Sequence, residues 1–237
     1  MKTWMWKIWA IAMLPAFVVA AQEVPLYDNT TTFANYNLMF PNNLEVGDQI
    51  WLANYTTDPY LTGFSFEYYS PNLTFSGTVT ADVRFYLNDG TNFNGYSTPY
   101  TKFYDSGPFE IQTPESAIGY NSAMLSFDSA DLYTDAQLNM NPNMQMPDNF
   151  TFVVMFSGLS GSDQVGLPSF EPPTVGSNYG DYWENDGNWV LENNYVGNVV
   201  QLIGFPVQLI AVPEPTTLCL AMTGAALLFG FARRRRQ

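Results

Sequence analysis

The sequence contains no histidine and only one cysteine. Without histidine, Ser-His-Asp and Cys-His catalysis and imidazole-bound zinc are excluded. The cysteine, Cys219, lies in an apolar run near the C-terminus, so the rest of the chain offers no disulfide, thiol nucleophile or cysteine-bound metal site. A phosphate-binding glycine loop is also missing. We therefore expect no enzymatic activity and no cofactor, with calcium left open as a bound ion.

Basic residues are scarce between the two ends of the chain. Residues 22–212 hold only Arg84 and Lys102 against 21 acidic residues, which gives this body a formal net charge of −19. Such a surface repels nucleic acid, because no basic patch is present to neutralise phosphates. It can attract cations, or it can keep the protein soluble at high local concentration.

The N-terminus has the pattern of a secretory signal peptide, predicted over residues 1–21. Lys2 and Lys7 form a charged start, and an apolar run extends from Ile8 to Val19. Small residues then offer a cleavage site that places the mature start near Gln22. Export is therefore the expectation.

The C-terminus combines three parts in a fixed order. The first is a Pro-rich motif formed by Val212, Pro213, Glu214 and Pro215. The second is an uncharged apolar run over residues 216–232, which as an α-helix would reach ~26 Å, close to the ~30 Å of a bilayer core. The third is a basic stop made of Arg233, Arg234, Arg235 and Arg236, which favours the cytoplasmic side.

This order resembles the PEP-CTERM sorting signal of bacterial exported proteins, also described as the C-terminal segment of some ice-binding proteins. The resemblance covers residues 211–237. It implies a single transmembrane helix, an exosortase-type processing peptidase as a partner, and a body held outside the cytoplasm before it reaches the cell surface or extracellular matrix. The alternative is a permanent membrane anchor that is never cut.

Within the body, residues 22–210 read as one domain, an all-β, jelly-roll-like β-sandwich. Apolar and polar residues alternate over residues 61–69 and 79–87, as in half-buried strands. Residues 150–156 and 199–210 are more continuously apolar and predict central strands, the second with a bulge or edge at Gly204 and Pro206. Residues 139–147 predict a surface loop. The residues expected to be buried are Val83, Phe85, Phe152, Val154 and Phe156.

Several body segments are also similar to predicted sandwich domains of other PEP-CTERM proteins. These segments are residues 45–50, 85–90, 104–107 and 181–187. The resemblance implies a fold but no established activity, so no catalytic residues can be assigned from it.

Two Asp-Gly steps, in Asn88-Asp89-Gly90 and Asn185-Asp186-Gly187, predict hairpin turns. A two-residue turn at the second step would pair Asp181 with Glu192, which is repulsive unless a cation screens it. Calcium is the alternative to a simple turn, because carboxylates and turn carbonyls are hard oxygen ligands. The candidate calcium ligands are Asp181, Glu184, Asp186 and Glu192.

Aromatic residues gather late in the body. Tyr182, Trp183 and Trp189 are candidates for a platform that stacks on sugars, although core packing would explain them equally.

Three function classes remain. The first is a structural or adhesive component of the envelope or exopolysaccharide matrix, which a filled sandwich without pockets would favour. The second is a carbohydrate- or calcium-binding module, which exposed rings in a concave face would favour. The third is a glycoside hydrolase, which needs two carboxylates flanking one bond. Exopolysaccharide is thus a candidate partner, beside the membrane and the peptidase.

Overall fold

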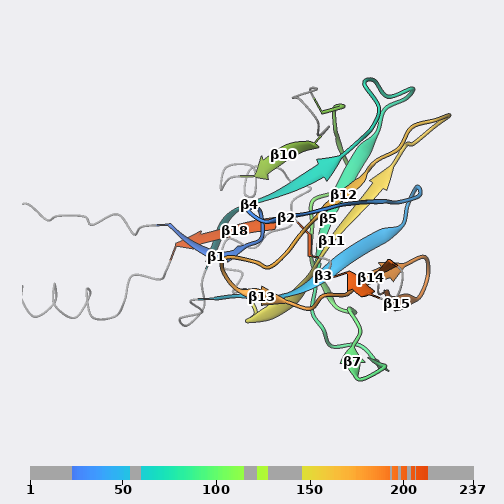
Figure 1. Cartoon of the computed structure of the whole chain (residues 1–237). Helices are drawn as coiled ribbons and strands as arrows, with labels where there is room; N and C mark the ends of the chain where they lie inside the picture. Colours follow the sequence, from blue (N-terminus) through green and yellow to red (C-terminus); the bar gives the residue numbers. More distant parts are fainter. Residues whose placement is uncertain are drawn as a thin grey trace, which may run out of the picture.

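A computed structural model describes most of the body of the protein. The described residues are 23–53, 60–114, 122–127, 146–192, 194–196, 199–201, 204–205 and 207–212. They form strands and contain no helix. Two large antiparallel sheets make up the fold (Figure 1).

The first sheet, sheet A, has the order β1-β18-β4-β12-β2, and β10 also pairs with β4, outside this order. Its strands are β1 (Val24–Asp28), β2 (Phe33–Met39), β4 (Tyr60–Tyr69), β10 (Ser122–Phe127), β12 (Gly166–Phe170) and β18 (Val207–Val212).

The second sheet, sheet B, has the order β15-β14-β3-β11-β5-β8, and the short strands β13 and β9 pair with β3 and β5. Its strands are β3 (Glu45–Trp51), β5 (Thr80–Tyr86), β8 (Lys102–Asp105), β9 (Phe109–Glu110), β11 (Asn149–Ser157), β13 (Ser177–Asn178), β14 (Tyr182–Asn185) and β15 (Trp189–Glu192). Two small hairpins complete the described strands, namely β6 (Asn92–Phe93) with β7 (Tyr96–Ser97), and β16 (Asn194–Val196) with β17 (Val199–Gln201).

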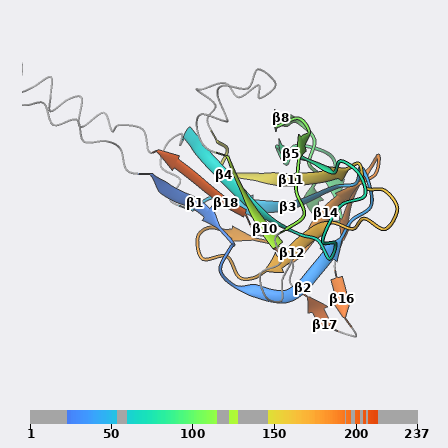
Figure 2. The same cartoon turned by 90° about the horizontal axis from the view of Figure 1, so that it is seen from above.

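The chain crosses repeatedly from one sheet to the other, as the view from above makes clear (Figure 2). It runs from β2 in sheet A to β3 in sheet B, back to β4, and again to β5. The predicted all-β sandwich is thereby confirmed, while the jelly-roll topology stays a prediction.

Aromatic side chains from both sheets fill the space between them. Phe64 of sheet A has its ring centroid 5.5 Å from that of Phe85 and 6.0 Å from that of Phe152, both in sheet B. All five residues predicted to be buried are fully enclosed, as the alternation in β5 and the apolar run in β11 require. Burial of this apolar surface is the main stabilising contribution to the fold.

The prediction of one strand over residues 199–210 was wrong. β17 ends at Gln201 and pairs with β16, whereas β18 begins at Val207 between β1 and β4. Between them Phe205 turns into the core against Phe40 and Tyr182. The apolar character of Phe205 thus reflects burial in the core and not strand pairing.

The surface-loop prediction for residues 139–147 needs a correction at its end. The side chain of Met146 has 0% exposure and belongs to the core, directly before β11. Residues 139–145 lie outside the described part of the chain.

The two ends of the described body lie side by side. β1 pairs antiparallel with β18, and Val24 lies opposite Ala211. Both strands lie on the same side of the molecule, away from β7 and β15 (Figure 1).

Candidate functional site

The connection from β5 to β8 forms a long arm, residues 87–101. Its two sides are joined by hydrogen bonds from Leu87 N to Thr101 O (2.9 Å) and from Gly90 N to Thr98 O (2.9 Å). The arm ends in the β6–β7 hairpin, whose turn residues Asn94 and Gly95 have φ angles of 51° and 98°. An Asn-Gly pair of this kind is the strongest local hairpin signal, and it locates the tip of the arm.

The predicted turn at Asp89-Gly90 was therefore placed too early in the chain. Asp89 lies within the arm, where its carboxylate accepts hydrogen bonds from Thr101 N (2.9 Å) and Thr101 Oγ1 (2.6 Å). These bonds hold the pKa of the Asp89 carboxyl below its usual value. Asp89 thus fastens the two sides of the arm to each other.

The β14–β15 hairpin has a three-residue loop, Asp186-Gly187-Asn188, because Asn185 pairs with Trp189. The predicted two-residue turn is wrong by one residue, and Gly187 adopts a φ of 131° that glycine tolerates. As a consequence Tyr182, not Asp181, lies opposite Glu192.

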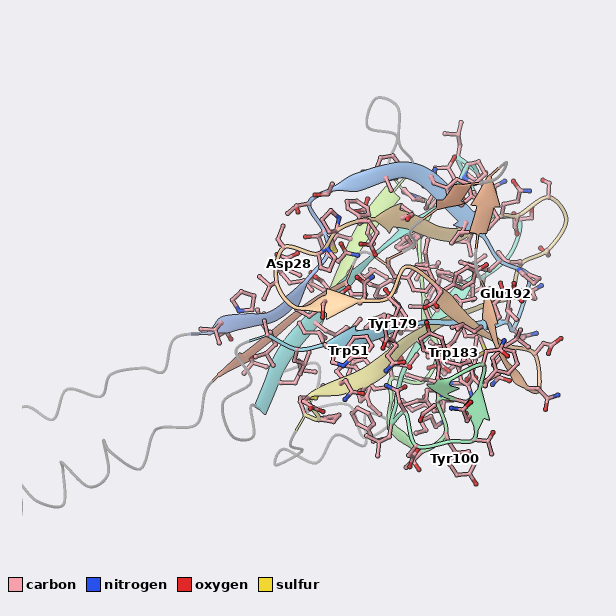
Figure 3. The ribbon with its side chains drawn as sticks, turned by 60° about the horizontal axis from the view of Figure 1, so that its bottom comes forward. Asp28, Trp51, Tyr100, Tyr179, Trp183 and Glu192 are labelled. Carbon is pink, nitrogen blue, oxygen red and sulfur yellow. The ribbon has the colours of Figure 1, made fainter. Side chains whose placement is uncertain are left out.

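Rings of the arm pack on the outer face of sheet B. Trp183 lies opposite Gly47 on that face, and the ring of Phe93 covers it at a centroid distance of 6.1 Å. Tyr96 contacts Tyr179 in the same way, at 5.1 Å. The arm is therefore docked on the sandwich through two aromatic contacts, at Trp183 and Tyr179, which are both labelled in Figure 3.

An open pocket of about 660 Å³ lies between the arm and the β14–β15 hairpin. Three aromatic residues line it together with amide and carboxylate groups, namely Phe93, Tyr100, Trp189, Asn92, Asn188 and Asp89. Tyr100 is 73% exposed and projects from the arm (Figure 3), whereas Trp189 is half-buried, with its ring 5.4 Å from that of Tyr86. The pocket thus combines apolar ring faces with hydrogen-bonding groups.

Only one of the three predicted platform residues reaches this pocket. Trp189 lines it, but Trp183 is 1% exposed beneath the arm. Tyr182 is 8% exposed and packs against Phe40 and Phe205 on the inner side of the sheet. Phe93 and Tyr100 take their place, and the Asn94-Gly95 turn was the sequence signal that could have drawn attention to the arm.

The four predicted calcium ligands are only partly brought together. Glu184 accepts a hydrogen bond from the Tyr182 hydroxyl (3.1 Å), and its pKa is raised first by burial and then by the charges of Glu192 and Asp186. Asp181 precedes β14, and burial raises the pKa of its carboxyl. Within the described part of the chain, no group of three or more acidic side chains is close enough to hold a metal ion.

Sequence reasoning missed a charged network on the outer face of sheet B. The Arg84 guanidinium binds the carboxylates of Glu45 and Asp82, and its Nε lies 3.5 Å from Asp105 Oδ2. Glu45 also accepts hydrogen bonds from the Tyr86 hydroxyl (2.9 Å) and from Asn185 Nδ2 (2.6 Å). Asp82 and Arg84 at alternate positions of one strand were the available signal, since alternate residues share a face.

Burial dominates the titration of Asp82 in this network. It raises the pKa of the Asp82 carboxyl to about 6, although the charge of Arg84 acts in the opposite direction. For Arg84, burial alone would lower the pKa, but Glu45 and Asp82 hold it above its usual range. Arg84 therefore stays positively charged, whereas the buried carboxyl of Asp82 loses its proton less readily than an exposed aspartic acid.

We expect the protein to be more stable at mildly acidic than at neutral pH. Burial raises the pKa of several carboxyls, so the folded state binds more protons than the unfolded state between about pH 4 and 6; these are Asp48, Asp82, Glu171, Asp181 and Glu184. The free energy of unfolding then falls as pH rises through this window. Thermal unfolding at pH 5 and pH 7.5 should give a Tm at least about 3 °C higher at pH 5.

Carboxyls with a lowered pKa, such as Asp89 and Asp163, change the stability with pH only below about pH 4. The stabilisation that they contribute at higher pH is lost as the pH falls through this range. Asp82→Asn should flatten the pH dependence between pH 4 and 6. A Tm that rises steadily from pH 5 to 7.5 would contradict the assignment.

A model of the PEP-CTERM protein-sorting motif matches residues 211–236. The chain carries a PEP-CTERM sorting motif. The predicted resemblance is confirmed, and the motif marks an exported surface protein that is anchored at the membrane and processed by an exosortase. No curated protein and no solved structure matches the chain.

The PEP-CTERM match begins inside the last strand of the sandwich. Ala211 and Val212 lie in β18 and pair with Leu61 and Tyr60 of β4. The rest of the segment lies outside the described residues, as does the predicted signal peptide. This includes Pro213, Glu214, Pro215, the apolar run 216–232 and the four arginines. Where the structure is described, it holds no helix long and apolar enough to cross a membrane.

Proposed function

We propose that the body is a non-catalytic glycan-binding module, through which this exported protein adheres to exopolysaccharide at the cell surface or in the extracellular matrix. The observation that carries the proposal is the pocket between the arm and the β14–β15 hairpin, with Phe93, Tyr100 and Trp189 in its walls. Aromatic faces pack against the apolar faces of sugar rings, while amide and carboxylate groups bind hydroxyls.

The charges around the pocket favour a neutral glycan. No lining residue is basic, and Asp89 is the only acidic one. The body as a whole carries a formal net charge of −19. Anionic polymers would be repelled over a distance of several ångströms, whereas neutral polysaccharides would not.

The residues that line the pocket support a hydrolase less well than they support a binding module. Glycoside hydrolysis uses two carboxyl groups, roughly 5–10 Å apart, on the two sides of one bond. Asp89 is the single carboxylate of the pocket, and Thr101 occupies it with two hydrogen bonds. Glu45 and Asp82 are a close carboxylate pair elsewhere on the face, but both are bound to Arg84.

Binding to a panel of neutral polysaccharides (cellulose, β-1,3-glucan, xylan and mannan) tests the proposal by affinity electrophoresis of the purified protein. Tyr100→Ala and Trp189→Ala should each weaken binding at least about tenfold, which corresponds to about 1.4 kcal/mol. Leu73→Ala is the matched control, because Leu73 is 72% exposed but lies outside the pocket.

Retained binding in both pocket variants would refute the proposed site, and absence of binding to any of the polymers would count against the function. Release of soluble sugars that stops in Asp89→Asn would replace the binding module by a hydrolase.

A further inference from the structure

A group of buried and half-buried polar side chains lies on the inner side of β3 and contains none of the residues that line the glycan pocket. Asn178 Nδ2 donates to Asp48 Oδ2 (2.9 Å) and to Glu171 Oε1 (2.6 Å), so one amide joins two carboxylates. Phe205 N also donates to Asp48 Oδ2 (3.3 Å). Together with Asn29 and Tyr27, these residues are called the interior acid cluster below.

The cluster brings together distant parts of the chain. Asp48 points inward from β3, because its neighbours Gly47 and Gln49 belong to the outer face and its pairing partner Phe152 is in the core. Asn178 belongs to β13, while Glu171 directly follows β12. Asn29 follows β1, so the cluster joins both sheets.

Several oxygen atoms of the cluster face the protein interior without a donor. Asp48 Oδ1, Asn29 Oδ1 and the Tyr27 hydroxyl are buried, and among the described residues no donor meets hydrogen-bond geometry at them, although the Tyr27 hydroxyl is close enough to the Asn29 side chain to interact with it. The orientation of Asn29 is fixed, since its Nδ2 donates to Phe170 O (2.8 Å) and Phe205 O (3.2 Å). Turning the amide over would place its oxygen against two carbonyls, so the free atom is an acceptor.

Unpaired buried acceptors are costly, and native proteins satisfy nearly all of them. Asp48 and Glu171 share one amide donor, Asn178 Nδ2, and no basic side chain of the described residues is paired with either of them. The basic residues of the described chain, Arg84 and Lys102, are bound to carboxylates in the outer network of sheet B. The cluster thus holds more oxygen acceptors than hydrogen-bond donors.

We propose that the interior acid cluster binds one divalent cation of the hard, oxygen-preferring class, for which Ca²⁺ is the best fit. Its ligands would be the carboxylates of Asp48 and Glu171 and the amide oxygen of Asn29, with the Tyr27 hydroxyl beside them. Two carboxylates balance the charge of one such ion, and Ca²⁺ accepts mixed oxygen ligands in flexible geometry. Zinc is disfavoured, because the cluster has no nitrogen or sulfur ligand.

Gly204 is the residue that allows these side chains to converge. A Cβ atom at this position would lie 2.4 Å from both Asn29 Nδ2 and Glu171 Oε1, and 2.5 Å from Asn178 Nδ2. Any other residue would push the side chains apart. The site differs from the β14–β15 hairpin acids considered above, and it does not depend on glycan binding.

A bound cation would connect the middle of β3, at Asp48, to the segments that directly follow β1 and β12. Because it binds the folded state only, it stabilises the protein in proportion to the logarithm of its concentration. Chelator-treated protein titrated with CaCl₂ should therefore show one binding site by calorimetry and a Tm that rises by several degrees at millimolar calcium.

Asp48→Asn and Glu171→Gln should each weaken calcium binding at least tenfold, while Glu184→Gln and Asp186→Asn on the hairpin should leave it unchanged. Asp48→Asn removes a buried charge and can raise the Tm by itself, so the binding isotherm is the deciding measurement. Glu171 is only half-buried, which keeps the second variant informative if the first does not fold.

Absence of calcium binding to the unsubstituted protein at millimolar concentration would overturn the proposal. So would binding that survives Asp48→Asn and Glu171→Gln, or binding that is lost in the hairpin variants. Because glycan binding is measured separately, either proposal can fail without the other.

Discussion

Replacing Phe85 by alanine should lower the free energy of unfolding by about 3–5 kcal/mol, the range measured for fully buried phenylalanines. The ring of Phe85 is at the centre of the core, in contact with five other rings. Its centroid distances are 4.6 Å to Tyr104, 5.1 Å to Phe150, 5.4 Å to Phe152, 5.5 Å to Phe64 and 5.9 Å to Phe103. Removing it leaves a cavity that the surrounding strands can close only in part, because β4, β5 and β11 are each held by pairing on both sides.

Urea unfolding followed by tryptophan fluorescence measures this change. Since domains are stable by only about 5–15 kcal/mol, the variant should lose a large part of its stability. Tyr100→Ala, at an exposed ring, should change the free energy of unfolding by less than about 0.5 kcal/mol. A loss below 1 kcal/mol in Phe85→Ala would mean that the aromatic core does not hold the sheets together.

Replacing Gly166 by alanine should be at least as damaging, for a reason that concerns the backbone. Gly166 lies in β12 opposite Met39 of β2 and Tyr69 of β4. A Cβ atom here would be 1.7 Å from the carbonyl oxygen of Leu38, and a paired backbone cannot move away alone. We expect a loss of about 3 kcal/mol or more, or a protein that does not fold.

Gly77→Ala is the matched control for this substitution. Its nearest obstacle would be Ser160 Oγ at 3.2 Å, the end of a side chain that can rotate. Comparison of the two melting temperatures and of the soluble yields separates local crowding from a general effect of removing glycine. Equal behaviour of both variants would contradict the close approach of β2 and β12.

Strands with a strong two-residue period were predictable, because alternation follows directly from the pleat. Val83 and Phe85 in β5 are the clearest examples. The register of the β14–β15 hairpin was not predictable. An Asp-Gly-Asn segment suits loops of two or three residues, and a difference of one residue moves every side chain to another partner.

The candidate sites depended on long-range pairing that no local pattern contains. Trp183 is buried because residues 87–101 fold over sheet B, so its sequence neighbourhood could not distinguish it from the pocket residue Trp189. Asp48 and Glu171 are separated by more than a hundred residues, and each resembles an ordinary surface acid in sequence. The two acids come together only in the folded protein, where β3, β13 and the end of β12 lie side by side.

The position of β18 between β1 and β4 determines when the protein can finish folding. β1 has no other partner strand in the described sheets, so sheet A stays incomplete until residues 207–212 have left the export machinery. Pairings between such distant segments form slowly. Because the sorting motif overlaps β18, the final pairing step takes place next to the membrane. The processing enzyme therefore meets a chain whose last strand is either paired, which completes sheet A, or unpaired, which leaves an open sheet edge that is prone to aggregation.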